Sequence, residues 1–398
     1  MKIAVISRCS QVFPNIRGGA DLTAMEYAIS LAEANASVVF IGRGCLKKNI
    51  DGLRFSRINS TLLIHSKSLL LYFLKAFILV MWSTLGAVVV IRKERPDIAY
   101  TFSSFTTIIL KKLFRRLPVI YTVVDPVHSH EIFRGSERGV RFVNNWILER
   151  VALHCADRVI AISEDVRRQI LKLGVMDESI SVLHPMPNPF LEEGDTASDS
   201  SHLLDVIQMD YVLSVGSQTG RKRFDILIQA SRYFDDNLKL IIVGNGPQRR
   251  SLEVDVSAMG LSEKVIFIDG VDDNSLSNLY KHSQLYVLIS DSEGMPITIV
   301  EAAFHGSPVL YFNPNLKIIE NFSDSFLSFN EISPSFVAQK VNYLYSKRKK
   351  GQFDTIQYRR WAMSYFSTSD KIKLHLIAIN QMFVPRADEI GQRHCRID

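Results

Sequence analysis

Short apolar runs alternate with helical patterns along the first half of the chain. Between the first two runs, Leu22, Met25 and Ile29 fall on one face of an expected helix over residues 21–34. A Ser-Glu-Asp sequence at Ser163 has the residue types of a helix N-cap. Fully apolar strands that alternate with helices favour a parallel sheet covered on both faces. The strands expected here cover residues 1–7, 37–41, 97–100, 118–124 and 157–162.

The second half repeats this pattern. It predicts strands at 211–215, 238–243, 265–268, 285–289 and 308–311, and helices at 225–233, 248–259, 275–282 and 297–304. The predicted fold class is therefore α/β, with two Rossmann-like domains over residues 1–190 and 207–358. An acidic, polar linker over residues 191–206 joins them. Open α/β folds bind ligands at the carboxyl ends of their strands, so we expect the domains to face each other across a cleft.

The stretch 69–91 is apolar enough to raise the question of a membrane. Lys75 interrupts it, and a membrane span would break a regular series of strands and helices. Two interpretations are favoured over a transmembrane span, which remains the third. The stretch forms a helix packed in the first domain, or that helix also docks on a membrane surface where nearby basic residues meet anionic lipid.

Charge is distributed unevenly along the chain. The net charge is +6, and residues 1–172 carry 25 Lys and Arg against 13 Asp and Glu. Such a basic half is either an ordinary solvated face or a surface for phosphate, nucleic acid or acidic lipid, and no nucleic-acid-binding motif is present. The four cysteines form no Cys-x-x-Cys pair, which argues against a zinc ribbon or a disulfide scaffold and favours a cytoplasmic location. Because residues 1–7 already have the pattern of a strand, no signal peptide is expected there.

The most informative segment runs from Ser292 to Ala302. It follows an apolar strand and opens a helix, and Gly294 stands close to the helix start. Free backbone N–H groups and the helix dipole favour an anion at such a junction. Glu293 lies in the loop and Glu301 lies two turns into the helix. Two acids at this spacing specify nothing alone, but the whole phrase indicates a binding site.

This phrase, EGMPITIVEAAFHGSPVL, resembles the retaining glycosyltransferases of family four, which have the GT-B fold and a Glu-x7-Glu signature at this position. Four further phrases resemble the family in the correct order, so the resemblance covers nearly the whole chain. They are RGGAD at 17–21, VGSQTGRKRFDILIQA at 215–230, VGNGPQ at 243–248 and FIDGV at 267–271.

The resemblance implies roles for individual residues. Lys222 would stabilise the diphosphate leaving group, Glu293 would position the donor sugar, and Glu301 would bind the ribose hydroxyls. The family's Arg position holds Ser217, so Arg221 or Arg223 would have to supply that charge. Main-chain contacts with the nucleotide sugar are implied for Gly18, Gly19, Gly244, Gly270, Val271, Gly294, Met295, Pro296 and Ile297.

Two other features follow from the resemblance. Val124 stands where many members carry a histidine before the retained Asp125, so His128 or His130 would have to reach the sugar instead. The segment 359–382 resembles the family's final helices, which cross back onto the first domain. The tail that follows, 383–398, is polar in composition.

The expected activity is metal-independent transfer of a hexose from a UDP- or GDP-sugar to an acceptor hydroxyl, with retention of anomeric configuration. No cofactor beyond the donor is expected. The acceptor would be a glycan or lipid-linked glycan at the cytoplasmic face of a membrane, on which the chain would lie peripherally. The alternatives are an epimerase or phosphorylase on the same fold, a binding protein with a degraded site, and a nicotinamide dehydrogenase. The last lacks Gly-x-Gly-x-x-Gly after the first strand.

Overall fold

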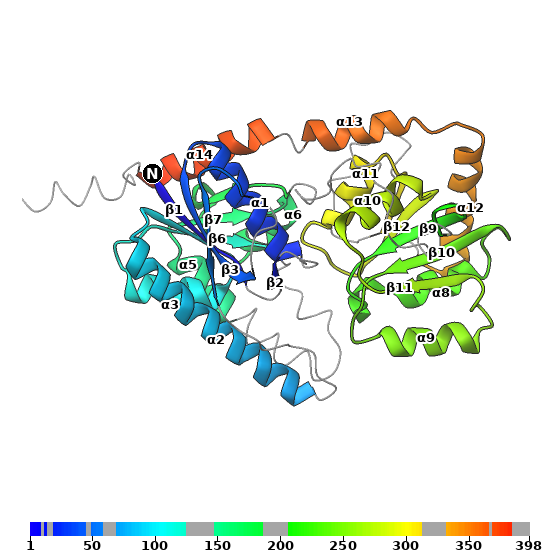
Figure 1. The fold of residues 1–398 in the computed structure, drawn as a ribbon, viewed down its shortest axis with the longest axis horizontal. Coiled ribbons are helices and arrows are strands. Elements are labelled where there is room, and N and C mark those ends of the chain that lie inside the picture. The colour runs from blue at the N-terminus through cyan, green and yellow to red at the C-terminus, as the bar shows by residue number, and fades with distance from the viewer. Residues whose placement is uncertain are drawn as a thin grey trace, which may run out of the picture. The chain divides into compact units, whose positions relative to one another are not determined.

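A computed structural model describes residues 1–8, 12–13, 19–44, 49–58, 69–124, 147–185, 206–312, 332–365 and 368–383. The chain divides into two compact units, each described below by itself. The first contains the described residues up to His184 together with the last helix, and the second contains those from Pro185 to residue 365. Both units are sheets of parallel strands covered by helices (Figure 1), which confirms the predicted α/β class with two Rossmann-like domains.

The first unit contains an eight-stranded sheet in the order β2-β3-β1-β5-β6-β7-β8, with β4 paired to β3. The register aligns Ile3 with both Val38 and Ile98. Its strands are β1 (Lys2–Ile6), β2 (Val12–Phe13), β3 (Ser37–Gly44), β4 (Leu53–Arg57), β5 (Ile98–Thr101), β6 (Val119–Val123), β7 (Arg158–Ala161) and β8 (Ile180–Val182). Its helices are α1 (Gly19–Glu33), α2 (Leu69–Glu94), α3 (Ser104–Leu113), α5 (Glu149–Cys155), α6 (Glu164–Leu171) and α14 (Thr368–Phe383).

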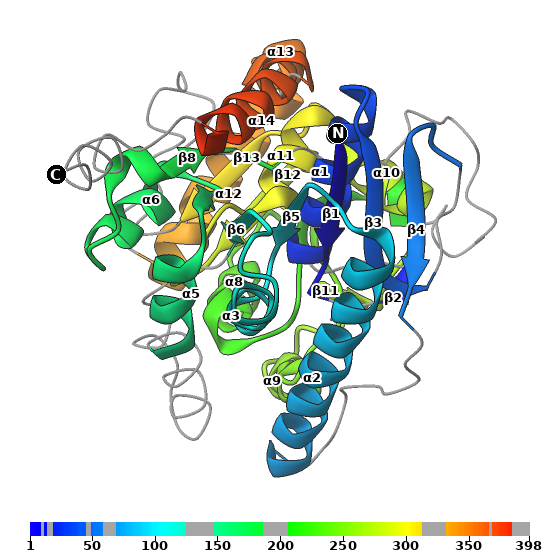
Figure 2. The ribbon, with the colours of Figure 1, turned by 90° about the vertical axis from the view of Figure 1, so that its left-hand side faces the viewer.

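Four of the five expected strands of this unit lie within one residue of their predicted bounds, and the strand predicted at 37–41 extends three residues further, to Gly44. Ser163 caps α6 as predicted, because its side chain accepts a hydrogen bond from the Val166 backbone N–H at 3.2 Å. The long helix α2 packs against α3 and β3 (Figure 2). None of the helices among the described residues, α2 included, has the length and apolar character needed to cross a membrane.

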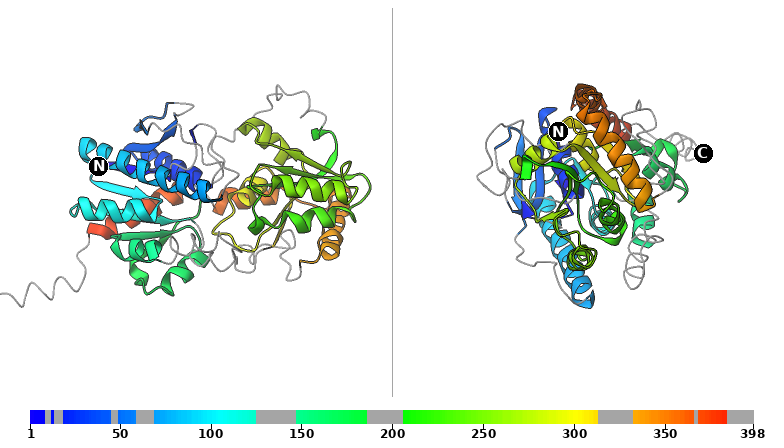
Figure 3. Two further views of the ribbon diagram at one scale, coloured as in Figure 1. Left: turned by 90° about the horizontal axis from the view of Figure 1, so that it is seen from below. Right: turned by 90° about the vertical axis from the view of Figure 1, so that its right-hand side faces the viewer.

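The second unit is a five-stranded sheet in the order β11-β10-β9-β12-β13. Its strands are β9 (Asp210–Val215), β10 (Leu238–Val243), β11 (Val265–Ile268), β12 (Leu285–Ile289) and β13 (Val309–Phe312). Its helices are α8 (Phe224–Ser231), α9 (Arg249–Ala258), α10 (Asp273–His282), α11 (Ile297–Phe304), α12 (Pro334–Lys349) and α13 (Thr355–Tyr365). The helix α12, orange in Figure 3, packs against α8 and β12.

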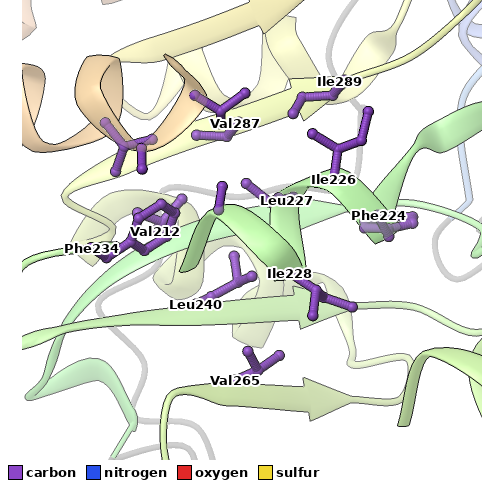
Figure 4. Packing of buried hydrophobic residues seen from close by; sticks show 14 of the residues in the cluster. Val212, Phe224, Ile226, Leu227, Ile228, Phe234, Leu240, Val265, Val287 and Ile289 are labelled. Atoms are coloured by element: carbon purple, nitrogen blue, oxygen red, sulfur yellow. The ribbon is translucent and has the colours of Figure 1, made fainter. Parts of the chain in front are cut away.

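Alternation along the strands divides the core of the second unit into two layers. Val212, Leu240 and Val287 point to one face, where they pack with Phe224, Leu227 and other residues of α8 (Figure 4). The neighbouring strand residues, including Tyr211, Ile241 and Tyr286, point to the other face and pack against α10, α11 and α13. Because both faces are covered, the strands are apolar at nearly every position, which explains why their bounds could be read from the sequence.

Besides the first two residues of the phrase at 17–21, three longer regions named in the sequence analysis lie wholly or partly outside the described residues. They are the expected linker, apart from Val206, the loop that carries Asp125, His128 and His130, and the residues beyond 383. The segment expected as final helices, 359–382, overlaps the second half of α13 and nearly all of α14. Of these, α13 packs against α11 in the second unit, and α14 packs against α1 in the first.

Candidate functional site

The second unit brings its predicted site residues to one edge of its sheet. Four segments follow the carboxyl ends of the adjacent strands β9, β10, β11 and β12, in which parallel pairing places all ends on the same side. These segments begin at Gly216, Gly244, Asp269 and Ser290. The motif positions that were scattered in sequence therefore share one edge.

The first two of these loops contact each other through their backbones. The Gln218 N–H donates to the Asn245 carbonyl at 3.1 Å, and the Gln248 N–H donates to the Gln218 carbonyl at 3.0 Å. A Cβ on Gly244, whose φ is 125°, would lie 2.3 Å from the Gly216 carbonyl oxygen, and one on Gly246 would lie 2.5 Å from Gln218 backbone atoms. Glycine at both positions is therefore required by this close approach.

A single 3-10 turn, Gly220–Lys222, follows β9 and presents two cations to Glu293. The Arg221 Nη1 lies 2.8 Å from Glu293 Oε2, and the Lys222 Nζ lies 2.7 Å from Glu293 Oε1. The Asp291 N–H donates to the Arg221 carbonyl at 2.9 Å, and the Arg221 guanidinium donates to the Ser292 carbonyl. The turn after β9 and the loop after β12 are thus joined through both backbone and side chains.

The side chain of Glu293 is only 7% exposed. Burial alone would raise its pKa, but the charges of Arg221 and Lys222, together with hydrogen bonds from Lys222 and Ser290, lower that pKa to about 2. Glu293 is consequently a carboxylate at neutral pH, and two cations face this one anion.

The third consecutive cation, Arg223, has other partners. Its backbone is left-handed at a φ of 40°, and α8 begins at the next residue. Its guanidinium lies 3.2 Å from Asp225 and 3.4 Å from Asp291. Of the two arginines proposed to replace the one missing at Ser217, the structure therefore places Arg221 against Glu293 and Arg223 against two aspartates.

Glu301 lies on α11, which begins directly after Pro296. Its side chain is buried, and its Oε2 accepts a hydrogen bond from Tyr280 of α10 at 2.8 Å. The segment between the two glutamates is buried as well, including Gly294, Met295 and Pro296. The backbone at the start of α11 is thus largely enclosed by protein.

The remaining predicted residues have different surroundings. Gly270 and Val271 follow β11, half-buried, and Gly19 is the exposed first residue of α1. Gly18 lies outside the described residues. Sequence reasoning missed Tyr280 and Ser290, because a tyrosine in an amphipathic helix and a serine after a strand carry no chemical signature. Within the described ranges, no cluster of His, Cys, Asp and Glu side chains could hold a metal ion.

Comparison with known proteins gives matches in both units. The model of the glycosyl transferases group 1 matches residues 208–359, and the model of Glycosyltransferase Family 4 matches residues 17–188. An Escherichia coli protein, UDP-Gal:alpha-D-GlcNAc-diphosphoundecaprenol alpha-1,3-galactosyltransferase, is 29% identical over 265 residues. That match covers 62% of this chain and 66% of the relative, slightly less than two thirds of its length.

Two solved structures share the fold over nearly the whole chain. Sucrose-phosphate synthase from Thermosynechococcus elongatus has a TM-score of 0.77 at 19% identity, covering 96% of this chain and 99% of that one. Anabaena Alr3699/HepE, in complex with UDP and glucose, has a TM-score of 0.70 at 18% identity, with the same coverage. Since the family models match both units and the fold is shared throughout, the chain belongs to glycosyltransferase family 4 and has the GT-B fold.

Proposed function

We propose that this protein transfers a hexose from a nucleoside-diphosphate sugar to an acceptor hydroxyl, with retention of anomeric configuration. The observation that carries the proposal is the cluster of Arg221, Lys222 and Glu293 at the carboxyl edge of the second sheet. Two cations against one ionised carboxylate leave a positive charge in a largely buried place. That charge suits the diphosphate on which negative charge grows as the glycosidic bond breaks.

The leaving group is stabilised by fixed protein charges and not by a metal in this proposal. Lys222, whose side chain is 10% exposed, and Arg221, at 22%, already lie where Glu293 holds them, so little reorganisation is needed during reaction. The loop before α11 and the first residue of that helix add backbone N–H groups at Met295 and Ile297. Gly244, Gly270 and Val271 follow strands at the same edge and would border the nucleotide.

Glu293 acts in this scheme as an acceptor that orients the cations and the sugar hydroxyls. A carboxyl group with a pKa of about 2 carries no proton to donate at neutral pH. Both of its oxygens are ion-paired, which also makes it a poor nucleophile. The departing phosphate would take the proton of the acceptor hydroxyl on the same face of the sugar, which gives retention.

Glu301 binds the ribose of the nucleotide in this proposal, because a carboxylate can accept hydrogen bonds from two vicinal hydroxyls. The donor base is proposed to be uracil or guanine. The UDP and glucose bound to the Anabaena neighbour support a uridine nucleotide. The name of the Escherichia coli relative, which acts on a diphosphoundecaprenol-linked sugar, supports a lipid-linked glycan as acceptor in polysaccharide assembly.

Binding and turnover can be tested separately. A thermal-shift panel of UDP, GDP, ADP and NAD should show stabilisation by UDP or GDP, and Glu301→Gln should reduce the shift. Glu253→Gln, which changes an exposed acid on α9, serves as the control. Transfer to a lipid-linked acceptor, with the new linkage assigned by NMR, separates a retaining transferase from an epimerase, a phosphorylase or a protein that only binds. Stabilisation by NAD alone would contradict the proposal.

We also propose that α2 places the enzyme on the cytoplasmic face of an anionic membrane. Ile78, Trp82, Leu85 and Val89 are 45–66% exposed, and their spacing places them on one face of the helix. Arg92 and Lys93 follow in the last turn of α2. An apolar stripe that ends in basic residues is typical of a helix lying in a lipid interface.

Vesicle sedimentation tests this surface. The protein should bind vesicles that contain anionic lipid, dissociate in high salt, and bind less after Leu85→Glu. Val254→Glu changes an equally exposed apolar residue on α9 and should leave binding unchanged. If Leu85→Glu binds as well as the unmodified protein, α2 is not the membrane surface.

A further inference from the structure

The helices α10 and α11 are joined by two side-chain contacts in register. Tyr280 of α10 donates to the carboxylate of Glu301 at 2.8 Å, and one turn earlier Ser277 is hydrogen-bonded to His305 Nε2 at 2.7 Å. The ring of His305 stacks on that of Tyr280 at 5.6 Å between centroids, with an interplanar angle of 17°. Glu301 is thus held from a neighbouring helix.

The direction of these hydrogen bonds follows from their chemistry. The backbone carbonyl of Glu301 can only accept, so the His305 Nδ1, at 2.8 Å, must carry the proton and donate to it. Burial lowers the pKa of His305, so the ring is neutral near pH 7 and its Nε2 accepts from the Ser277 hydroxyl. The backbone of Glu301 is therefore fixed through Ser277 and His305, while its side chain is fixed through Tyr280.

Tyr280 is suited to hold a buried carboxylate. Its side chain is fully buried, and its hydroxyl has one proton, which is directed to Glu301 Oε2. Burial and the nearby charge of Glu301 raise the pKa of Tyr280 well above its usual value, so the hydroxyl remains a donor at any pH at which the protein works. A buried carboxylate without such a donor would turn toward water.

We infer that Tyr280 is a positioning residue, which sets the orientation of the Glu301 carboxylate and thereby the protein's selectivity for a nucleotide with both ribose hydroxyls. The inference rests on the proposed function, because it takes Glu301 as the ribose ligand. Tyr280 itself contacts no substrate in this scheme. Its effect reaches the nucleotide only through Glu301.

Tyr280→Phe is the test, with Tyr211→Phe as a matched control. Tyr211 is equally buried and also donates one hydrogen bond, but to the backbone carbonyl of Leu279 at 2.8 Å. The two variants lose the same hydroxyl from the same unit, and only one of these hydroxyls holds a site carboxylate. Dissociation constants are measured for the nucleoside diphosphate preferred among UDP, GDP and ADP, and for its 2′,3′-dideoxy analogue.

The expected result is a loss of ribose selectivity without a loss of chemistry. Tyr280→Phe should weaken binding of the ribonucleotide about tenfold and leave binding of the dideoxy analogue unchanged. The KM for the donor sugar should rise accordingly, with kcat little altered, whereas Tyr211→Phe should preserve the selectivity. In a Glu301→Gln background, Tyr280→Phe should have no further effect, because the two residues act as one unit.

The outcomes separate this inference from the proposed function. If Glu301→Gln removes the selectivity and Tyr280→Phe behaves like Tyr211→Phe, Tyr280 is only structural and the inference is wrong. If Glu301→Gln itself keeps full selectivity for the ribonucleotide, the assignment of Glu301 to the ribose is wrong, and the inference fails with it.

Discussion

Each unit of this protein contains a buried carboxylate paired with a lysine, and the two pairs differ in what surrounds them. In the first unit, Lys371 of α14 lies 2.6 Å from Glu26 of α1, and both side chains are about 5% exposed or less. In the second unit, Glu293 is shared by Arg221 and Lys222 on a turn at the edge of the sheet. The first pair joins two helices that are far apart in sequence. In the second, two cations, Arg221 and Lys222, face a single carboxylate, so one positive charge is not neutralised.

The pKa shifts follow this difference. Burial lowers the pKa of Lys371 to about 8 despite the attraction of Glu26, as expected for an amine closed off from water. The pKa of Glu293 falls to about 2 although burial opposes the fall. An excess of positive charge is thus characteristic of the second pair, and it suits the binding of an anion. The first pair contributes to holding α14 in place.

The largest effect is expected from breaking the structural pair. Lys371→Met should lower the free energy of unfolding of the first unit by about 3–5 kcal/mol, because Glu26 would remain buried without its cation. Chemical denaturation measures the loss. The double variant Glu26→Gln/Lys371→Met should recover most of it, and Lys373→Met, which removes an exposed lysine of the same helix, should change little. A double variant as unstable as the single one would contradict this account.

Breaking the second pair should instead affect catalysis. Lys222→Ala should reduce the transfer rate at saturating donor by about 10²–10³, because it removes a charge directed at the leaving diphosphate. Lys239→Ala is the control, because Lys239 is the second residue of β10 and, among the contacts described, its amine donates only to the Glu263 carbonyl. If Lys222→Ala transfers sugar within about threefold of the rate of the unmodified protein, the pair in the second unit has no catalytic role, and the two pairs do not differ in function.

Acid should reveal the low pKa of Glu293. Its folded-state pKa lies below the unfolded value, so its contribution to stability is complete above about pH 4.5 and is lost as the pH falls toward about 2. The contribution amounts to about 3 kcal/mol. The difference in unfolding free energy between the unmodified protein and Glu293→Gln should therefore shrink over this range. A difference that stays constant from pH 7 to pH 3 would show that Glu293 titrates normally.

The smallest effect distinguishes the two arginines. Arg223→Ala should change the transfer rate by less than about threefold, because its partners are the partly exposed Asp225 and Asp291. Arg221→Ala should lower the rate about tenfold or more, because Arg221 contacts Glu293. Steady-state assays of both variants decide which arginine replaces the one that the family carries at the position of Ser217. The reverse order would assign that role to Arg223.

Much of the second unit could be predicted from the sequence, since strands such as β10 and β12 are apolar throughout and end at polar loops. The edge strand β4 could not, because its Arg54 and Ser56 interrupt the pattern where one side of the strand is uncovered. The phrase around Glu293 indicated the candidate site only through its resemblance to a family. The choice between Arg221 and Arg223 depends on a single turn and one left-handed residue, which no residue pattern encodes.

The place of α14 has a consequence for how the chain is made on the ribosome. Residues 368–383 belong to the first unit although they are synthesised after the whole of the second. Until these residues leave the ribosome, Glu26 cannot form its ion pair with Lys371, and α1 cannot pack against α14. Domains usually complete folding in the order of their synthesis. In this protein the second unit can finish first, and the unit that begins the chain is the last to be completed.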